Sequence, residues 1–151
     1  MALDQLLPQR ANNTYRGHTL ALALFGLLLL LKAGISLGSI FNGHTAASSA
    51  DGIPLDTYTP AGARTVLSLF ALLGLANVTI CVIGTVVLVR YRSLIPFMFG
   101  LLLLQQLSRG LILQILPIER TGTPPGSAIN VVILSMMILG LALSLWRRDN
   151  L

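Results

Sequence analysis

The stretch LIPFMFGLLLLQQLSRGLILQILP, from Leu94 to Pro117, decides the fold of this chain. It is apolar over about one bilayer thickness, at roughly 1.5 Å of rise per helical residue, so it predicts a transmembrane helix. The middle of the stretch nevertheless holds four polar side chains, Gln105, Gln106, Ser108 and Arg109. An arginine at that depth costs on the order of 3 kcal/mol unless a partner meets it. We therefore expect the function of the protein to involve whatever meets Arg109.

The composition of the whole chain agrees with this stretch. The chain has 151 residues, of which 54% are hydrophobic and only 10% are charged. Its mean hydropathy is +0.81. Because soluble globular domains contain about 25% charged residues, the composition predicts an integral membrane protein. We expect a single all-α membrane domain over residues 1–151, with no additional soluble domain.

Four apolar segments predict an antiparallel bundle of four transmembrane helices. The expected spans are about residues 19–41, 61–89, 94–117 and 128–146. The first is longer than the roughly 7–15 apolar residues of a signal peptide, so we expect it to be retained. The fourth is the most purely apolar by its sequence. Residues 42–60 are rich in Gly, Ser and Pro and predict a long outer loop, a length that is often functional.

Local patterns predict how two of these spans begin and pack. Thr59 followed by Pro60 predicts the N-cap and first position of the second span. Gly34 and Gly38 in the first span form a GxxxG pair, a spacing that permits close approach of another helix. A stripe of small and polar residues at helical spacing predicts a packing face on the second span: Gly74, Asn77, Cys81 and Gly84.

The basic residues predict the orientation in the bilayer. With four spans, three arginine pairs fall on one side of the membrane: Arg10 and Arg16, Arg90 and Arg92, and Arg147 and Arg148. The acidic residues Asp51, Asp56 and Glu119 fall on the other side. The positive-inside rule then places both termini in the cytoplasm, in what we expect to be a bacterial inner (plasma) membrane. This orientation explains the net charge of +5, and we expect no nucleic-acid partner.

The second notable feature is that the expected spans contain cationic side chains but no acidic side chain. Lys32 and Arg109 each lie roughly 12–14 Å from the outer ends of their helices, and Arg64 begins the second span on that side. Side-chain amides accept hydrogen bonds but cannot neutralise these charges. We expect the third span either to be the most enclosed helix of the bundle or to bind another protein, with Gln114 exposed near its outer end. The candidate ligand-binding residues are Lys32, Arg64, Asn77, Gln105, Gln106 and Arg109.

Three partners for these cations remain open from the sequence. The outer loops can fold inward, so that Asp51, Asp56 or Glu119 pairs with them. An outward-facing polar pocket can hold an anionic ligand, such as a lipid phosphate, a fatty-acid carboxylate or an isoprenoid phosphate, because arginine binds oxyanions through two donors. A partner subunit can also supply the acid.

The motifs that the sequence lacks limit the chemistry. Cys81 is the only cysteine, so no intrachain disulfide forms. The sequence contains no metal-binding, phosphate-binding or nucleophile motif. We therefore expect a non-catalytic protein without cofactor or metal, either an accessory subunit of a larger membrane complex or a binder of an anionic lipid-like ligand. Membrane lipids and other membrane subunits are the expected partners. The alternatives are an enzyme acting on a lipid or isoprenoid phosphate, with His44 or Asp56 in the reaction, and an anion channel or transporter.

One segment carries a family resemblance. The run RYRSLIPFMFGLLLLQQLSRGLILQILPIERTGTPPG, residues 90–126, contains a basic turn, an apolar helix with Gln-x-x-x-Arg and a Pro-Pro-Gly loop. In these features it resembles small four-helix inner-membrane proteins of bacteria that carry no assigned activity. The resemblance covers roughly the second half of the chain. It implies a four-span bundle and no particular chemistry.

Overall fold

Four long helices make up most of the chain. The structure is a computed structural model that describes Leu6, Pro8 and residues 10–146. Its long helices are α2 (Thr19–Phe41), α4 (Pro60–Arg90), α5 (Ile95–Ile115) and α6 (Pro125–Leu145). Each is long and apolar enough to cross a membrane. The predicted all-α bundle of four spans is confirmed, and every helix end lies within three residues of its predicted position.

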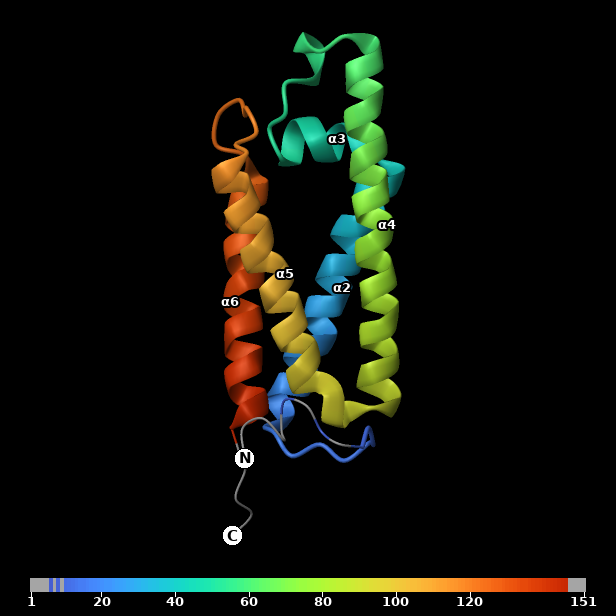
Figure 1. Cartoon of the computed structure of the whole chain (residues 1–151), viewed down its shortest axis with the longest axis vertical. Coiled ribbons are helices and arrows are strands. Elements are labelled where there is room, and N and C mark those ends of the chain that lie inside the picture. The colour runs from blue at the N-terminus through green and yellow to red at the C-terminus, as the bar shows by residue number, and fades with distance from the viewer. Residues whose placement is uncertain (1–5, 7, 9, 147–151) are drawn as a thin grey trace.

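The two ends of the bundle carry different segments. Residues 10–18 and the last turn of α6 lie at one end (Figure 1), which we call the terminal end, and the two longer connections lie at the opposite end, which we call the loop end. The N-terminal segment is tied to the terminal end, since His18 N donates to the Leu143 carbonyl at 3.0 Å and Ser93 N donates to the Asn12 carbonyl at 3.2 Å. Arg147 and Arg148, used for the orientation, lie outside the described residues.

Close packing of α2 on α4 follows from the predicted small-residue stripe. Gly74, Cys81 and Gly84 are all buried. A Cβ atom at Gly74 would lie 2.7 Å from the Ser36 carbonyl oxygen, and one at Gly84 would lie 2.6 Å from a methyl group of Leu29. The stripe therefore lets the two helices approach more closely than larger side chains would allow. The predicted start of α4 is also confirmed, because the Thr59 hydroxyl accepts from Gly62 N at 3.2 Å.

The main apolar core fills the terminal half of the bundle. The rings of Phe25 on α2 and Phe99 on α5 meet edge to face, with centroids 5.1 Å apart. Gly140 on α6 lies directly against the Phe99 ring, where no larger side chain would fit. Toward the loop end α4 and α5 diverge (Figure 1). The fully buried large side chains of this core are Phe25, Leu28, Ile95, Phe99, Leu102 and Met137.

The predicted outer loop is partly helical. Residues 43–50 form a short α-helix, α3 (Gly43–Thr45), continued by the π-helix η1 (Ala46–Ala50), and a 3-10 turn, η2 (Leu55–Thr57), follows. Ala47, Ile53 and Leu55 are buried in a second apolar cluster against the first turns of α4. The Gly, Ser and Pro content of this segment indicated a loop, whereas burial of its few aliphatic residues folds it over the bundle.

Helix α4 is longer than a bilayer requires. Its 31 residues span about 46 Å at 1.5 Å per residue, against a hydrocarbon core of about 30 Å. At the loop end α4 rises past the other three long helices, beside α3 and η2 (Figure 1). The first turns of α4 pack against residues 43–57, which we call the cap.

The prediction that the third span is enclosed holds only for the first part of the helix. All buried residues of α5 lie in its first eight positions, and the last of them is Leu102. From Leu104 to Ile115 the residues of α5 are partly or fully exposed. The prediction that α5 is the most enclosed helix is therefore wrong for its polar half, because the helices separate there. Gln114 is exposed near the end of α5, as expected.

Candidate functional site

Polar side chains from four helices and from Asp51, just after η1, gather toward the loop end of the bundle. Counted along the helices, Arg109 lies about 9 Å from the end of α5, Asn130 about 8 Å from the start of α6, and Lys32 about 14 Å from the end of α2. These depths fall within one leaflet of a bilayer. We call the following residues the polar cluster: Lys32, Asp51, Asn77, Gln105, Gln106, Arg109 and Asn130.

Asn130 links α6 to two residues of α5. Its Oδ1 atom accepts from Arg109 Nη1 at 3.1 Å and from Gln106 Nε2 at 3.3 Å. Both donors belong to one face of α5, since positions 106 and 109 are three residues apart in a helix. A single acceptor therefore orients the guanidinium group and one glutamine amide together.

Asp51 approaches the same guanidinium group from the loop end. Its Oδ2 atom lies 3.9 Å from Arg109 Nη2, and the side chains of Arg109 and Asp51 are 40% and 22% exposed. Two glycines set its position. Gly52 turns the chain with a φ of +71°, and Gly126 lets α6 approach, because a Cβ there would lie 2.9 Å from Asp51 Oδ1. Of the three acids considered from the sequence, Asp51 is the one that reaches Arg109.

A second amide pair joins α5 to α4. Gln105 Nε2 donates to Asn77 Oδ1 at 3.2 Å, while Asn77 Nδ2 donates to the Leu73 carbonyl at 3.0 Å. The amide group of Asn77 therefore bonds to its own helix through its nitrogen and to α5 through its oxygen. The Oε1 atom of Gln105 is buried and has no hydrogen-bond partner. The cluster therefore contains an unused acceptor beside its cations.

Lys32 is half-buried on α2, on the face that packs toward α4. It lies close enough to Arg109 and Cys81 for electrostatic interaction. In the described part of the chain, no carboxylate lies within ion-pair distance of its ammonium group. Asp51 therefore lies near Arg109 but within ion-pair distance of no lysine, and the formal charge of the cluster is +1.

Other sequence candidates lie apart from the cluster. Arg64 is exposed in the projecting part of α4, and its Nε atom donates to the Pro60 carbonyl of its own helix at 3.2 Å. His44, Asp56 and Glu119 are also exposed, and among the described residues none of them forms an ion pair with Lys32 or Arg109. Within the same residues no group of three or more His, Cys, Asp or Glu side chains is placed to hold a metal ion.

Asn130 is the cluster residue that the sequence analysis missed. The fourth span was judged by its overall apolar content, so its single side-chain amide, five residues after Pro125, was overlooked. The available signal was depth: Arg109 lies six residues from the loop end of α5, and Asn130 lies at a similar distance from the loop end of α6. Polar residues at matching depth on consecutive antiparallel helices are expected to pair, because hydrocarbon offers them no other partner.

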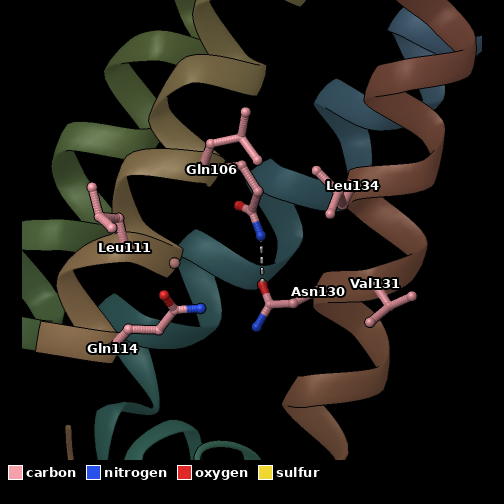
Figure 2. Close-up of a pocket in the computed structure, with 8 residues that line it drawn as sticks. Gln106, Leu111, Gln114, Asn130, Val131 and Leu134 are labelled. Atoms are coloured by element: carbon pink, nitrogen blue, oxygen red, sulfur yellow. Dashed lines mark hydrogen bonds between the residues drawn. The ribbon is translucent and has the colours of Figure 1, made fainter.

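A groove runs along α5 and α6 beside the cluster. Its volume is about 410 Å³, within the range of ligand pockets, and it is largely open on one side. Figure 2 shows Gln106 and Asn130 pointing toward each other between the two helices, with the Gln114 amide further along α5. Gly110 leaves space in the wall, since a Cβ atom there would meet nothing within 4 Å. The lining residues are Gln106, Leu107, Gly110, Leu111, Gln114, Asn130, Val131 and Leu134.

The fold and the site together define an integral membrane protein with four candidate spans and a polar cluster at the loop end of the bundle. Comparison of the chain with protein-family models, with curated proteins and with solved structures finds no match.

Proposed function

We propose that this protein is a non-catalytic binder of an anionic lipid-like amphiphile, whose oxyanion is held by the polar cluster. The observation that carries the proposal is the uncompensated charge: among the described residues Asp51 lies 3.9 Å from Arg109, and no carboxylate lies within ion-pair distance of Lys32. A charge without a partner at this depth is costly, and an oxyanion from a ligand removes that cost.

The geometry at Arg109 supports an oxyanion rather than a neutral ligand. Asn130 engages one donor of the guanidinium group at 3.1 Å, while Asp51 at 3.9 Å lies beyond hydrogen-bond distance. Donors of Arg109 therefore remain free for two parallel bonds to a phosphate or carboxylate. The free Oε1 atom of Gln105 adds an acceptor for a ligand hydroxyl group. In the orientation predicted by the positive-inside rule, this site belongs to the outer leaflet.

The two alternative activities receive less support. Conduction requires a polar path through the bundle, yet Phe25, Phe99 and Met137 fill its terminal half with apolar side chains. An enzyme needs a general acid or base near the bound phosphate. The two loop residues considered for that role, His44 and Asp56, are exposed to solvent and form no described contact with Arg109.

Native mass spectrometry of the full chain with dioleoyl phosphatidylglycerol tests the proposal. Phosphatidylglycerol carries one negative charge, which matches the formal charge of the cluster. We expect Lys32→Gln and Arg109→Gln each to weaken its binding at least about tenfold, the effect of losing one charge-assisted hydrogen bond. Arg64→Gln removes the same charge outside the cluster and is the matched control, expected to bind as the wild type does.

Two results would overturn the proposal. One is equal binding of phosphatidylglycerol by the wild type and by both cluster variants. The other is equal binding of zwitterionic dioleoyl phosphatidylcholine and phosphatidylglycerol by the wild type, because a site selected by an oxyanion must distinguish them.

A second candidate function, accessory subunit of a membrane complex, is favoured by one face of α2. Gly34 and Gly38 have nothing within 4 Å of their Cβ positions, so none of the described helices packs on the GxxxG pair. The same face carries Leu30 and Phe41, which are 73% and 83% exposed. We propose that a further transmembrane helix packs closely on this face of α2.

Native mass spectra in mild detergent also test this second candidate. We expect a complex with another subunit, or with a second copy, that is lost in Gly34→Leu and Gly38→Leu while the monomer remains folded. Gly110→Leu, at an equally open glycine of α5, is the control. A complex that persists in both α2 variants would contradict the proposed role of this face.

A further inference from the structure

The groove between α5 and α6 shares two residues with the polar cluster. Gln106 and Asn130 line the groove, and Asn130 Oδ1 is also the acceptor for Arg109. The residue after Arg109 is Gly110, whose missing side chain opens the groove at the depth of the guanidinium group. A molecule in the groove is therefore one side chain away from the cation of the proposed oxyanion site.

The lining of the groove has the chemistry of a lipid. Leu107, Leu111, Val131 and Leu134 supply apolar walls. The amides at its base are only partly used, because Gln106 Nε2 donates to Asn130 Oδ1, and within the described residues Asn130 Nδ2 and Gln106 Oε1 form no hydrogen bond. Inside a membrane, where water is absent, these amide groups need hydrogen-bond partners that a lipid molecule supplies. Ester carbonyls of a lipid accept from amides, and its acyl chain covers the leucines.

The size and position of the groove favour one lipid chain over a protein helix. Its volume of about 410 Å³ suits a small flexible segment, whereas a helix with side chains is about 10 Å across. Gln114, one residue before the end of α5, lies where the polar part of a leaflet begins. The groove thus extends from the bilayer interface to the depth of Gln106.

We propose that the α5–α6 groove holds an acyl chain of a glycerophospholipid from the surrounding leaflet, whose phosphate reaches Arg109 past Asn130. This inference rests on the proposed function and names its ligand class and source: a membrane lipid that arrives sideways through the bundle wall, rather than an anion from water. Asn130 then separates the apolar and the polar part of one site.

Chain-length dependence tests the inference in the full-length protein. The probes are dioleoyl phosphatidylglycerol and the short-chain, water-soluble dihexanoyl phosphatidylglycerol, with inorganic phosphate as the anion that lacks a chain. We expect Gly110→Leu to fill the groove and weaken the long-chain lipid about tenfold or more, because buried methylenes carry its affinity. The short-chain lipid should change less than about twofold. Ala76→Leu, which adds the same kind of side chain at an exposed small residue of α4, is the control.

The outcomes separate the groove from the proposed function. Unchanged long-chain binding in Gly110→Leu overturns the groove assignment and leaves the oxyanion site standing. Equal loss of both lipids in Gly110→Leu also overturns it, because the cluster itself would then be disturbed. Unchanged lipid binding in Arg109→Gln, together with loss in Gly110→Leu, overturns the oxyanion site and leaves the groove. Binding of inorganic phosphate as tight as that of the long-chain lipid identifies a water-borne anion and overturns the lipid source.

A second measurement does not depend on the folding of a variant. A phosphatidylglycerol with a photoreactive group near the middle of one acyl chain is irradiated with the wild-type protein in bilayers. We expect labelled peptides to contain Leu107, Leu111, Val131 or Leu134. Labelling spread evenly over the exposed leucines of α2 and α4 would overturn the assignment.

Discussion

Asn130 accepts two hydrogen bonds at one oxygen atom, and one of the donors is charged. At the scale of single residues this is the contact that holds the polar cluster together, because Asp51 lies 3.9 Å from the same guanidinium group and is partly exposed. Ion pairs open to solvent contribute little to stability, whereas an unpaired buried donor is costly. The neutral amide of Asn130 therefore does more to hold the Arg109 side chain in place than the carboxylate of Asp51 does.

The first prediction concerns Asn130. Asn130→Leu leaves the donors of Arg109 and Gln106 without their acceptor, so we expect the free energy of unfolding to fall by about 1–3 kcal/mol. Asn130→Asp keeps an acceptor oxygen and adds a charge opposite to that of Arg109, so it should retain most of the stability. Reversible unfolding in mixed micelles measures both variants. Equal stability of Asn130→Leu and Asn130→Asp would show that this contact carries little energy.

The second prediction concerns Tyr15, which lies before the first span. Burial raises the pKa of its phenol from 10.0 to about 12, and its hydroxyl group has no hydrogen-bond partner. The unfolded chain loses this proton near pH 10, while the folded chain keeps it until about pH 12. The stability contributed by Tyr15 is therefore complete below pH 10 and is lost as the pH rises toward 12.

Tyrosinate absorbance and unfolding between pH 9 and 12 provide the measurement, with the range taken from the shift to about 12. We expect Tyr15→Phe to remove the most alkaline tyrosine titration and to reduce the alkaline loss of stability. Tyr58→Phe, at an exposed tyrosine, is the control. An alkaline unfolding profile that is the same in the wild type and in Tyr15→Phe would contradict the prediction.

At the scale of elements, glycines decide which helix faces meet. Gly74 and Gly84 bring α4 onto α2, and Gly126 brings α6 close to the end of η1. Gly34 and Gly38 also form a small-residue pattern on one helix, yet both face open space. A small-residue pattern therefore predicts a face that can pack closely, but the pattern does not say whether the partner belongs to the same chain.

The third prediction compares two of these glycines. Gly84→Ala places a methyl group 2.6 Å from Leu29 and should cost about 1–3 kcal/mol through overpacking. Gly34→Ala meets nothing, so it should stabilise α2 by up to about 1 kcal/mol through helix propensity. Unfolding of the two variants in the same micelles measures the difference. A loss at Gly34 as large as that at Gly84 would show that the open face of α2 is occupied.

At the scale of the whole molecule, the four candidate spans bring residues 10–18 and the last turn of α6 to the same end of the bundle (Figure 1). The arginines beside the terminal end, Arg10, Arg16, Arg90 and Arg92, predict that this side is cytoplasmic. The compartment matters for function, because it decides which leaflet supplies a ligand to the polar cluster.

The fourth prediction tests this orientation. In a Cys81→Ala background, a cysteine is introduced at Thr57 in the cap or at Arg92 at the terminal end. A membrane-impermeant maleimide added to sealed right-side-out vesicles should label Thr57→Cys and leave Arg92→Cys unlabelled until the vesicles are opened. The reverse pattern would place the polar cluster in the cytoplasmic leaflet.

Prediction from the sequence succeeded where a property depends on residues close in the chain. The four spans, the Thr59 cap and the small-residue face of α4 follow from composition and helical spacing alone. It failed for the enclosure of α5 and for the fold of residues 43–57, because both depend on where distant segments come to rest. The family resemblance of residues 90–126 stays a prediction.

The sequence by itself determined that this chain forms four helices long and apolar enough to cross a membrane, since transfer into hydrocarbon depends on the apolar content of each segment. It also identified Lys32, Arg109 and Gln105 as costly residues at that depth. Only the tertiary structure selected Asp51 over Asp56 and Glu119, added Asn130, and separated Arg64 from the cluster. These outcomes depend on distances across the bundle, which follow from how the helices pack in the terminal half and diverge toward the loop end.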